Sequence, residues 1–297
     1  MPTDLNALAV FALVAQQRSF RAAADRLGVT RSAVSQTIGR LETTMGLALV
    51  RRTTRSVSLT EAGERLHAAL APALAEIEAA IESTGDHAGA PRGQLRLAVS
   101  SIAERFLAGP LLAGFAAAHP AVQLDVTVTD EEFDIVAEGF DAGVRLGEVI
   151  EQDMIAVPVS AEQRQIVVAA PAYLAREGAP AHPRDLAGFR CIGWRPAPQK
   201  APYRWEFTEG GRDITVAVAP EITTNDMALM IKLALAGAGL TFGLEETFRP
   251  SIARGELVPL LEAYCPPFAG FYLYYPSRRN LAPKLRALID HLRYTKG

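Results

Sequence analysis

The stretch Ser19–Glu42, SFRAAADRLGVTRSAVSQTIGRLE, contains two segments of helical periodicity that are joined by only three residues. In the first segment, apolar side chains recur at positions i, i+3, i+4 and i+7, which predicts a short amphipathic helix. These side chains are Phe20, Ala23, Ala24 and Leu27. Ser19 is placed to cap the start of this helix, and Gly28 suits the left-handed residue that ends it.

Thr30 is placed to cap a second helix, whose apolar stripe has the same helical spacing. The stripe consists of Val34, Ile38, Leu41 and Met45. Because the connection Gly28–Thr30 is too short for an antiparallel hairpin, the two helices are expected to cross steeply. The sequence therefore predicts a helix-turn-helix.

The face opposite this second stripe carries side chains that suit a DNA major groove. It consists of Arg31, Ser32, Gln36 and Arg40, with Ser35 on its flank. Short hydroxyls and a glutamine can reach base edges, and arginines bind guanine or phosphate. An ordinary solvated helix face is the alternative interpretation.

The next segment, LALVRRTTRSVSLTEAG over residues 47–63, predicts two short extended pieces around a basic tip. The tip contains Arg51, Arg52 and Arg55, with Thr53 and Thr54 between them. Such a hairpin would act as a wing that presents positive charge to the DNA backbone beside the groove. A solvated basic hairpin without a partner is the alternative.

Charge is distributed unevenly over the 297 residues. The chain has a formal net charge of -3, yet residues 1–60 hold eight arginines and three acidic residues, a local charge of +5. A basic module on an acidic body indicates that only the N-terminal part meets a polyanion. The other interpretation is a receptor whose N-terminal helices bind protein, and a steep salt dependence would distinguish DNA from such a partner.

The run FRAAADRLGVTRSAVSQTIGRLETTMGLALVRRTTRSVSLTEAG, residues 20–63, resembles the winged helix-turn-helix of LysR-type transcriptional regulators. The shared features are an alanine-rich second helix, a serine in the recognition helix, an LE ending, an RT wing and LTEAG. The resemblance implies base or phosphate contacts by Thr30, Arg31, Ser32, Ser35, Gln36 and the wing arginines. Gln36 stands where an arginine is common in the family. The DNA-binding domain is expected to span residues 1–60.

Residues 61–90 are expected to form a linker helix and a hinge. Thr60 can cap the helix, and an apolar stripe runs along one side of it: Leu66, Leu70, Ala73, Leu74, Ile77 and Ile81. Packing against a second copy would cover this stripe, and docking on the chain's own body is the alternative. Pro72 is expected to bend the helix, and the glycine-rich stretch Gly85–Gln94 marks the hinge. Family members form a homodimer or a homotetramer through such a helix.

Residues 91–297 alternate between strand-like and helical runs, which predicts an α/β body with parallel sheets covered by helices. Helices are expected over 102–118 and 131–138. The repeat of the pattern indicates two similar units with a cleft between them, where small ligands usually bind.

Polar residues at the ends of the predicted strands are candidates for ligand contacts. Ser100 and Ser101 open a helix whose free N–H groups would favour an anion. Thr224 and Asn225 occupy the analogous place in the second unit, and Thr129 and Arg145 follow or lie in other strands. Helix capping and an ion pair within the fold are equally open interpretations for these residues.

The body also resembles the effector-binding half of LysR-type regulators, in AEGFDAGVRLG, VVAAPAYLAREGAPAHPRDLAGFRCI and NDMALMIKLALAGAGL. The resemblance implies the two-lobed type 2 periplasmic-binding-protein fold, with lobe 1 over about 91–161 plus 266–297 and lobe 2 over about 162–265. It implies a site for a small polar or anionic effector, formed by Ser100, Ser101, Thr129, Arg145, Thr224 and Asn225.

Other function classes find little support. The sequence has no phosphate-loop lysine motif and no Gly-x-Ser-x-Gly elbow, so an enzyme is not expected. The histidines are scattered, and Cys191 and Cys265 have no metal or redox spacing, so neither a metal nor a cofactor is expected. The most apolar window, residues 227–244, contains Lys232 and several glycines, so no membrane span is predicted. We expect a cytoplasmic protein.

Overall fold

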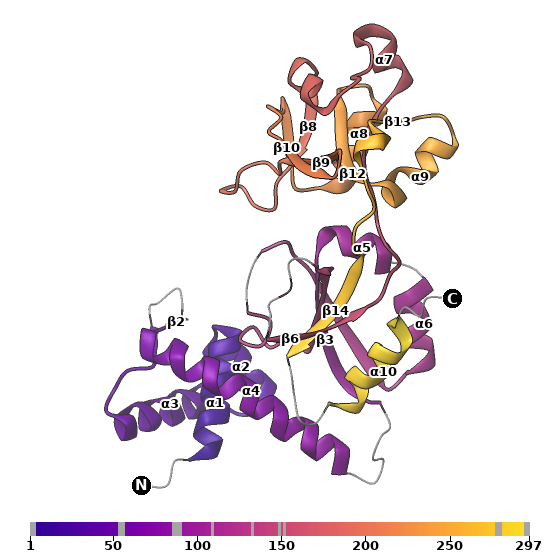
Figure 1. The fold of residues 1–297 in the computed structure, drawn as a ribbon. Helices are drawn as coiled ribbons and strands as arrows, with labels where there is room; N and C mark the ends of the chain where they lie inside the picture. The colour runs from indigo at the N-terminus through magenta and orange to yellow at the C-terminus, as the bar shows by residue number, and fades with distance from the viewer. Residues whose placement is uncertain are drawn as a thin grey trace.

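The computed structural model describes residues 4–52, 57–84, 91–107, 110–131, 134–147, 150, 153–276 and 281–293. Figure 1 shows three parts: an N-terminal helical head, an α/β lobe beside it, and a second α/β lobe at the far end of the molecule. We call residues 4–59 the head, the lobe next to it lobe 1, and the distant one lobe 2.

The head contains a helix-turn-helix followed by a small hairpin. Its elements are α1 (Leu5–Gln17), α2 (Phe20–Leu27), α3 (Arg31–Met45), β1 (Val50–Arg52) and β2 (Val57–Leu59). The predicted caps are confirmed, since Ser19 Oγ accepts the N–H of Ala22 at 3.2 Å and Thr30 Oγ1 accepts that of Ala33 at 3.2 Å. Gly28 has φ 66°, the left-handed conformation expected of it.

The predicted apolar stripes of α2 and α3 are buried except at their C-terminal ends. Phe20, Ala23 and Ala24 of α2 and Val34, Ile38 and Leu41 of α3 are all in the head core. Leu27 and Met45, by contrast, remain 42% and 40% exposed. Both lie in the last turn of their helix.

Helix α4 (Glu61–Thr84) packs on the head with its first half only. Leu66 and Leu70 contact the head core, whereas Ile77 and Ile81 are 52% and 67% exposed. The predicted stripe is therefore divided: the chain's own head covers its start, and its end faces solvent. Pro72 lies within the helix without ending it.

Lobe 1 is a five-stranded sheet with helices, and it is built from two separate parts of the chain. Its elements are β3 (Gly93–Val99), α5 (Ser101–Leu107), α6 (Pro110–Ala118), β4 (Val122–Val128), β5 (Ala142–Leu146), β6 (Met154–Pro158), β14 (Phe271–Pro276) and α10 (Pro283–Leu292). The strand order is β4-β3-β5-β14-β6. The expectation of parallel sheets is corrected here, because β14 returns from lobe 2 and pairs antiparallel with both β5 and β6.

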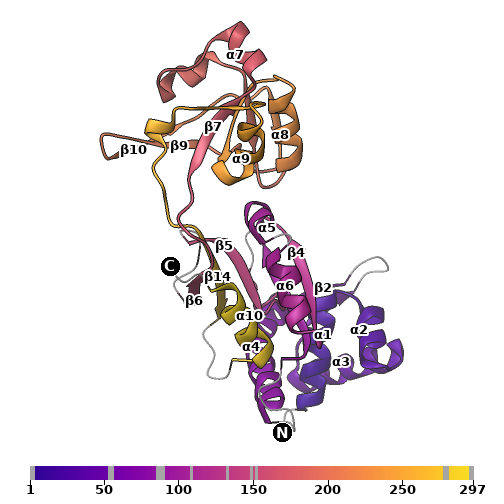
Figure 2. The ribbon, with the colours of Figure 1, turned by 90° about the vertical axis from the view of Figure 1, so that its right-hand side faces the viewer.

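Lobe 2 has a second five-stranded sheet, of order β11-β8-β12-β7-β13, and a β9–β10 hairpin. Its elements are β7 (Gln165–Ala169), α7 (Pro171–Glu177), η2 (Pro183–Gly188), β8 (Cys191–Trp194), β9 (Trp205–Glu209), β10 (Arg212–Val216), β11 (Ile222–Thr224), α8 (Met227–Leu235), β12 (Leu240–Leu244), α9 (Glu245–Ala253), β13 (Val258–Leu260) and η3 (Glu262–Tyr264). Two extended segments connect the lobes (Figure 2). They are joined by reciprocal backbone hydrogen bonds between Gln163 and Phe268, of 2.9 and 2.8 Å.

Two predicted helices of lobe 1 differ from the structure. The single helix expected over 102–118 is two helices, α5 and α6. The helix expected over 131–138 is wrong, because residues 135–139 form a turn. Asp134 Oδ1 accepts the N–H groups of Val136 and Ala137, at 2.8 and 3.2 Å, and so caps a single helical turn. Gly139 ends this turn in the left-handed conformation, with φ 73°.

Within the described part of the chain, no helix has both the length and the apolarity needed to cross a bilayer. The same residues contain no group of three or more metal-binding side chains. Burial raises the pKa of the Cys191 thiol to about 12 and that of Cys265 to about 11, which keeps both in the unreactive thiol form.

Helix α1 of the head and helix α4 both lie against lobe 1, at the turn before β5. His67 of α4 lies at this junction and is only 8% exposed. Burial lowers the pKa of His67 below 6.5, and Arg18 acts in the same direction, whereas the nearby carboxylates of Glu138 and Asp134 act against this shift. His67 is therefore neutral in the folded protein at neutral pH.

This junction predicts a pH dependence of stability. Because the pKa of His67 is lower in the folded state, the unfolded chain takes up the proton first as the pH falls below about 6.5, and stability falls with it. We expect the melting temperature to drop more between about pH 7.5 and about pH 5.5 in the wild type than in His67→Gln, which keeps the other titrating groups. This range extends about one unit to either side of the ordinary histidine pKa. Equal drops in the two proteins would contradict this.

Candidate nucleic-acid interface and ligand cavity

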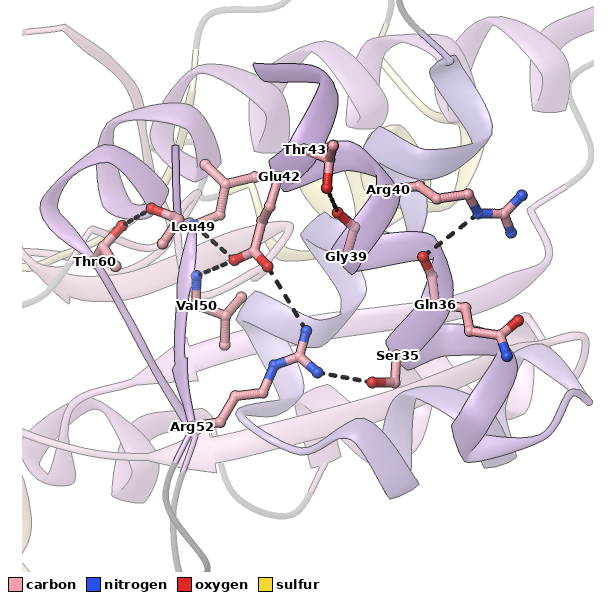
Figure 3. Close-up of polar contacts among 11 residues, drawn as sticks. Ser35, Gln36, Gly39, Arg40, Glu42, Thr43, Leu49, Val50, Arg52 and Thr60 are labelled. Carbon is pink, nitrogen blue, oxygen red and sulfur yellow. Dashed lines mark hydrogen bonds and ion pairs between the residues drawn. The ribbon is translucent and has the colours of Figure 1, made fainter. Parts of the chain in front are cut away.

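Helix α3 presents a continuous polar face to solvent. Arg31, Ser32, Gln36 and Arg40 are all exposed on it, and Thr30 lies at its start. The hydroxyls of Thr30 and Ser32 are 3.0 Å apart, and Arg40 Nε lies 3.5 Å from the carbonyl oxygen of Gln36. The side chains of Gln36 and Arg40 both point away from the head (Figure 3). The structure thus brings the predicted reading residues onto one accessible surface.

The guanidinium of Arg52, in the wing, is held by contacts within the head. Its Nη1 donates to Ser35 Oγ at 2.7 Å, and its Nη2 lies 3.8 Å from Glu42 Oε2 (Figure 3). The same group lies 4.4 Å from the ring centroid of Phe20. Arg52 therefore ties the wing to both helices of the helix-turn-helix, and Ser35 is its acceptor.

Glu42 is a functional residue that the sequence reasoning missed. Its Oε1 accepts the backbone N–H groups of Leu49 and Val50, at 2.8 and 3.0 Å. These bonds fix the start of the wing against the C-terminal part of α3. The feature of the sequence that could have indicated this role is that Glu42 is an isolated carboxylate near the end of a basic helix, in the LE pair of the motif.

The remaining wing residues are only partly described. Arg51 is exposed on β1, where it pairs with Ser58 of β2. Thr53, Thr54 and Arg55 lie outside the described residues. Among the described wing residues, Arg51 thus presents its charge to solvent.

The predicted ligand residues of lobe 1 are occupied by contacts within the fold. Asp130 Oδ1 accepts the N–H of Ser101 at 2.9 Å, and Ser100 Oγ accepts the N–H of Ala103 at 3.3 Å. Thr129 Oγ1 accepts the N–H of Glu131 at 3.2 Å. The Ser101 hydroxyl is buried and has no hydrogen-bond partner among the described residues. Capping accounts for most of these side chains.

The predicted residues of lobe 2 show the same pattern. Asp226 Oδ1 accepts two N–H groups at the start of α8, those of Ala228 and Leu229, at 2.8 and 3.1 Å. Thr224 Oγ1 accepts the N–H of Asp226 at 2.9 Å, and Asn225 is exposed. Helix α8 therefore begins with a carboxylate already bonded to its N–H groups.

Arg145 is also engaged in the fold. Its Nη2 donates to the backbone carbonyl of Glu131 at 2.7 Å, and its guanidinium lies 5.9 Å from the ring centroid of Tyr274. Arg145 thus holds the segment after β4 against β5. These contacts favour a structural role for Arg145, through a carbonyl oxygen and an aromatic ring, where an ion pair was the expected alternative.

One cavity draws residues from both lobes and has a volume of about 470 Å³. Lobe 1 contributes Asp130 and Glu131, and lobe 2 contributes Trp194, Lys200 and Tyr203 among others. The Trp194 indole N–H is buried and lacks a hydrogen-bond partner among the described residues. The six predicted residues do not line this cavity, although Thr129 and Ser101 adjoin its Asp130. Sequence reasoning missed the two aromatic side chains, of which only Trp194 lies at the end of the predicted strand RCIGW.

A winged helix-turn-helix head, a long connecting helix and two α/β lobes around a cavity together define a DNA-binding regulator with a ligand-binding body. Residues 5–64 match the family of bacterial regulatory helix-turn-helix proteins, lysR family, and residues 88–296 match the LysR substrate binding domain. The chain belongs to the LysR family of transcriptional regulators, and it is not an enzyme.

Similar proteins span almost the whole chain. A transcriptional regulator of Pseudomonas aeruginosa is 41% identical over 99% of this chain and 96% of its own. The regulators YcaN and PgrR of Escherichia coli K12 are 38% and 34% identical, over 99% and 98% of this chain and 96% and 97% of theirs. The structure of CrgA, a LysR-type regulator from Neisseria meningitidis, has a TM-score of 0.59 at 28% identity and covers 98% of both chains. Full-length AphB of Vibrio cholerae, at 22% identity, shares the fold with a TM-score of 0.64 over 97% of this chain and 98% of its own.

Proposed function

We propose that the polar face of α3 reads the operator in the major groove while the wing contacts the adjacent backbone. The observation that carries this proposal is the accessible surface of Arg31, Ser32, Gln36 and Arg40 beside a wing fixed by Arg52. Thr30 and Arg51 flank it, and Arg55 belongs to the same proposed interface by sequence. A fixed wing and helix act as one rigid reading surface, so little ordering entropy is lost on binding. The DNA partner implies a place of action in the cytoplasm.

The operator is proposed to be a pseudo-palindrome read by a symmetric homodimer, or by a homotetramer made of two such dimers. The exposed second half of α4, with Ile77 and Ile81, is the apolar surface that a second copy would cover. Two heads held by paired helices present two recognition helices to successive turns of the duplex.

The ligand is proposed to be a small polar molecule in the cavity between Asp130 and Glu131 of lobe 1 and Trp194 and Tyr203 of lobe 2. An anionic ligand would meet Lys200 in this lining, but the N–H groups of Ser101 and Ala228 at the starts of α5 and α8 already bond to aspartates. A ligand that donates hydrogen bonds to carboxylates and packs on aromatic rings suits this lining better.

For the DNA side, Gln36→Ala should alter base preference, whereas Arg51→Ala should weaken binding to all sequences about equally. A side chain that reads a base edge contributes about 1–3 kcal/mol of discrimination at its position, and a phosphate contact contributes none. The measurement is fluorescence anisotropy of the full chain on duplexes from its own promoter region, with single base changes. If Gln36→Ala bound every duplex in the wild-type order of preference, this face would not be the reading face.

For the cavity, a thermal-shift panel of amines, amino acids and carboxylates is expected to find its stabilising compounds among those that carry an amine. Glu131→Gln should abolish the shift, because it removes the charge of a cavity carboxylate, whereas the described fold holds Glu131 through its backbone N–H and carbonyl. Glu177→Gln in the exposed surface of lobe 2 is the matched control. Stabilisation by carboxylates alone would restore the anionic ligand.

A further inference from the structure

We infer that lobe 1 carries a docking surface for the head of the same chain, formed by residues 134–141, and that a ligand in the cavity between the lobes acts on the head through this surface. The second part rests on the ligand-binding function proposed above. The surface lies between the head and the rim of the cavity between the lobes. It belongs neither to the predicted DNA-binding face nor to the lining of that cavity.

Gln16 of α1 makes the closest contact between the head and this surface. Its side-chain amide occupies the volume that a Cβ on Gly139 would fill. Gly139 has φ 73°, so its backbone conformation and its bare face both favour glycine. The head therefore lies directly on the backbone of the turn.

Arg18 forms an ion pair that orients the head on this surface. It ends α1 in the left-handed conformation, with φ 47°, and its Nη2 lies 3.7 Å from Glu138 Oε1. Both side chains are largely exposed, so this ion pair contributes little stability. It favours one orientation of the head over others, and it can separate at little cost.

The junction is packed incompletely, unlike the cores on either side of it. A cavity of about 440 Å³ lies between the head, α4 and lobe 1, and its lining includes Leu27, His67, Leu74 and Phe140. Domain cores in proteins are close-packed, whereas surfaces that separate and rejoin tolerate such gaps. The junction thus has the character of a reversible contact.

The turn itself is rigid. Arg96 donates to the carbonyl oxygens of Glu138 and Gly139, at 3.1 and 2.9 Å, and its guanidinium lies 4.7 Å from the Phe140 ring centroid. Asp141 accepts the backbone N–H of Arg96 at 2.9 Å. These contacts hold residues 134–141 to β3, so a displacement of this part of lobe 1 moves the docking surface as a unit.

Packed side chains connect residues 134–141 to the rim of the cavity between the lobes. Ile135 and Phe140 form a buried cluster with Tyr274, the ring over which Arg145 lies. Arg145 in turn donates to the carbonyl of Glu131, a residue of the cavity lining. A ligand that shifts Glu131 would therefore act, through Arg145, on the cluster that supports the docking surface. The contact between this surface and the head has two states, and the shift would favour either the docked or the released head.

The test is cross-linking of a cysteine pair, Arg18→Cys with Glu138→Cys, in the full chain with a short bismaleimide. The natural cysteines are buried and remain as thiols, so they give little background. We expect an intrachain product that forms about tenfold faster than with the control pair Arg18→Cys and Glu177→Cys, because contact raises the effective concentration. A mixture of isotopically labelled and unlabelled copies identifies products between chains. Products only between chains, or a rate equal to the control, would overturn the docking surface.

Two further measurements test the inference without DNA. Glu138→Arg should speed amide hydrogen exchange in residues 134–141, and Arg18→Glu with Glu138→Arg should restore it. Arg145→Ala at the cavity end should change the cross-linking rate at least about threefold, since coupled sites typically differ by factors of about five or more. An unchanged rate would overturn the coupling. None of these readouts requires an operator, so failure of the proposed DNA contacts would leave them unaffected.

Discussion

Replacement of Glu42 by alanine is expected to destabilise the head by about 3 kcal/mol and to remove most of its DNA affinity. One carboxylate oxygen holds the N–H groups of Leu49 and Val50, and the other lies beside Arg52. Hydrogen bonds to a charged group contribute about 1.5–3 kcal/mol each, and the N–H groups left behind are partly buried. The wing would lose its attachment to α3, and Arg52 would lose its counter-charge.

Native-state hydrogen exchange of α3 in the full chain measures this loss. About 3 kcal/mol corresponds to a roughly hundredfold faster exchange of the most protected amides. The matched control is Glu61→Ala, whose carboxylate pairs with Arg65 on an exposed helix surface and should change stability by less than about 0.5 kcal/mol. If Glu42→Ala exchanged as slowly as Glu61→Ala, the carboxylate would not be the support of the wing.

The second large effect is expected at Gly63, where α4 crosses the start of the wing. A Cβ at Gly63 would overlap the backbone carbonyl of Leu49, which also accepts the N–H of Thr60 at 2.9 Å. Because the neighbour is backbone rather than a flexible side chain, Gly63→Ala should cost at least the 1–3 kcal/mol typical of overpacking. The linker helix would be pushed away from the head.

Gly39→Ala is the matched substitution, because Gly39 also lies inside a helix but has open space where its Cβ would stand. Alanine there should stabilise the head by about 0.5–1 kcal/mol through helix propensity. The two substitutions are therefore expected to have opposite signs in the same exchange experiment. Equal effects at Gly39 and Gly63 would contradict the close packing of α4 on β1.

Local rules predicted much of the head from the sequence. The caps at Ser19 and Thr30 and the left-handed Gly28 depend on residues within three positions, so a linear pattern contains them. The exposure of Leu27 and Met45, at the ends of the stripes, depends on which other elements pack there, and helical periodicity does not contain this information. The role of Glu42 was missed because its partners lie seven and eight residues away, across a turn.

The body was harder to predict, for two physical reasons. The direction of β14 depends on the return of the chain from lobe 2, a long-range property that alternation of elements does not encode. The pattern of polar strand ends left ligand contact and helix capping equally open, and the carboxylates Asp130 and Asp226 occupy the N–H groups that a ligand would need. The cavity lining follows from the approach of two lobes, so Trp194 and Tyr203 could be found only in three dimensions.

The central claim is that the basic head binds duplex DNA through its exposed arginines and α3. Its most direct test is the affinity of the full chain for a duplex from its own promoter region, measured over a series of salt concentrations. Each phosphate contact releases counterions, so the logarithm of the affinity should fall linearly with the logarithm of salt, with a slope of about -0.9 per contact. Arg51→Ala should reduce this slope by about one contact. No binding at the lowest salt, or an affinity that does not change with salt, would contradict the account.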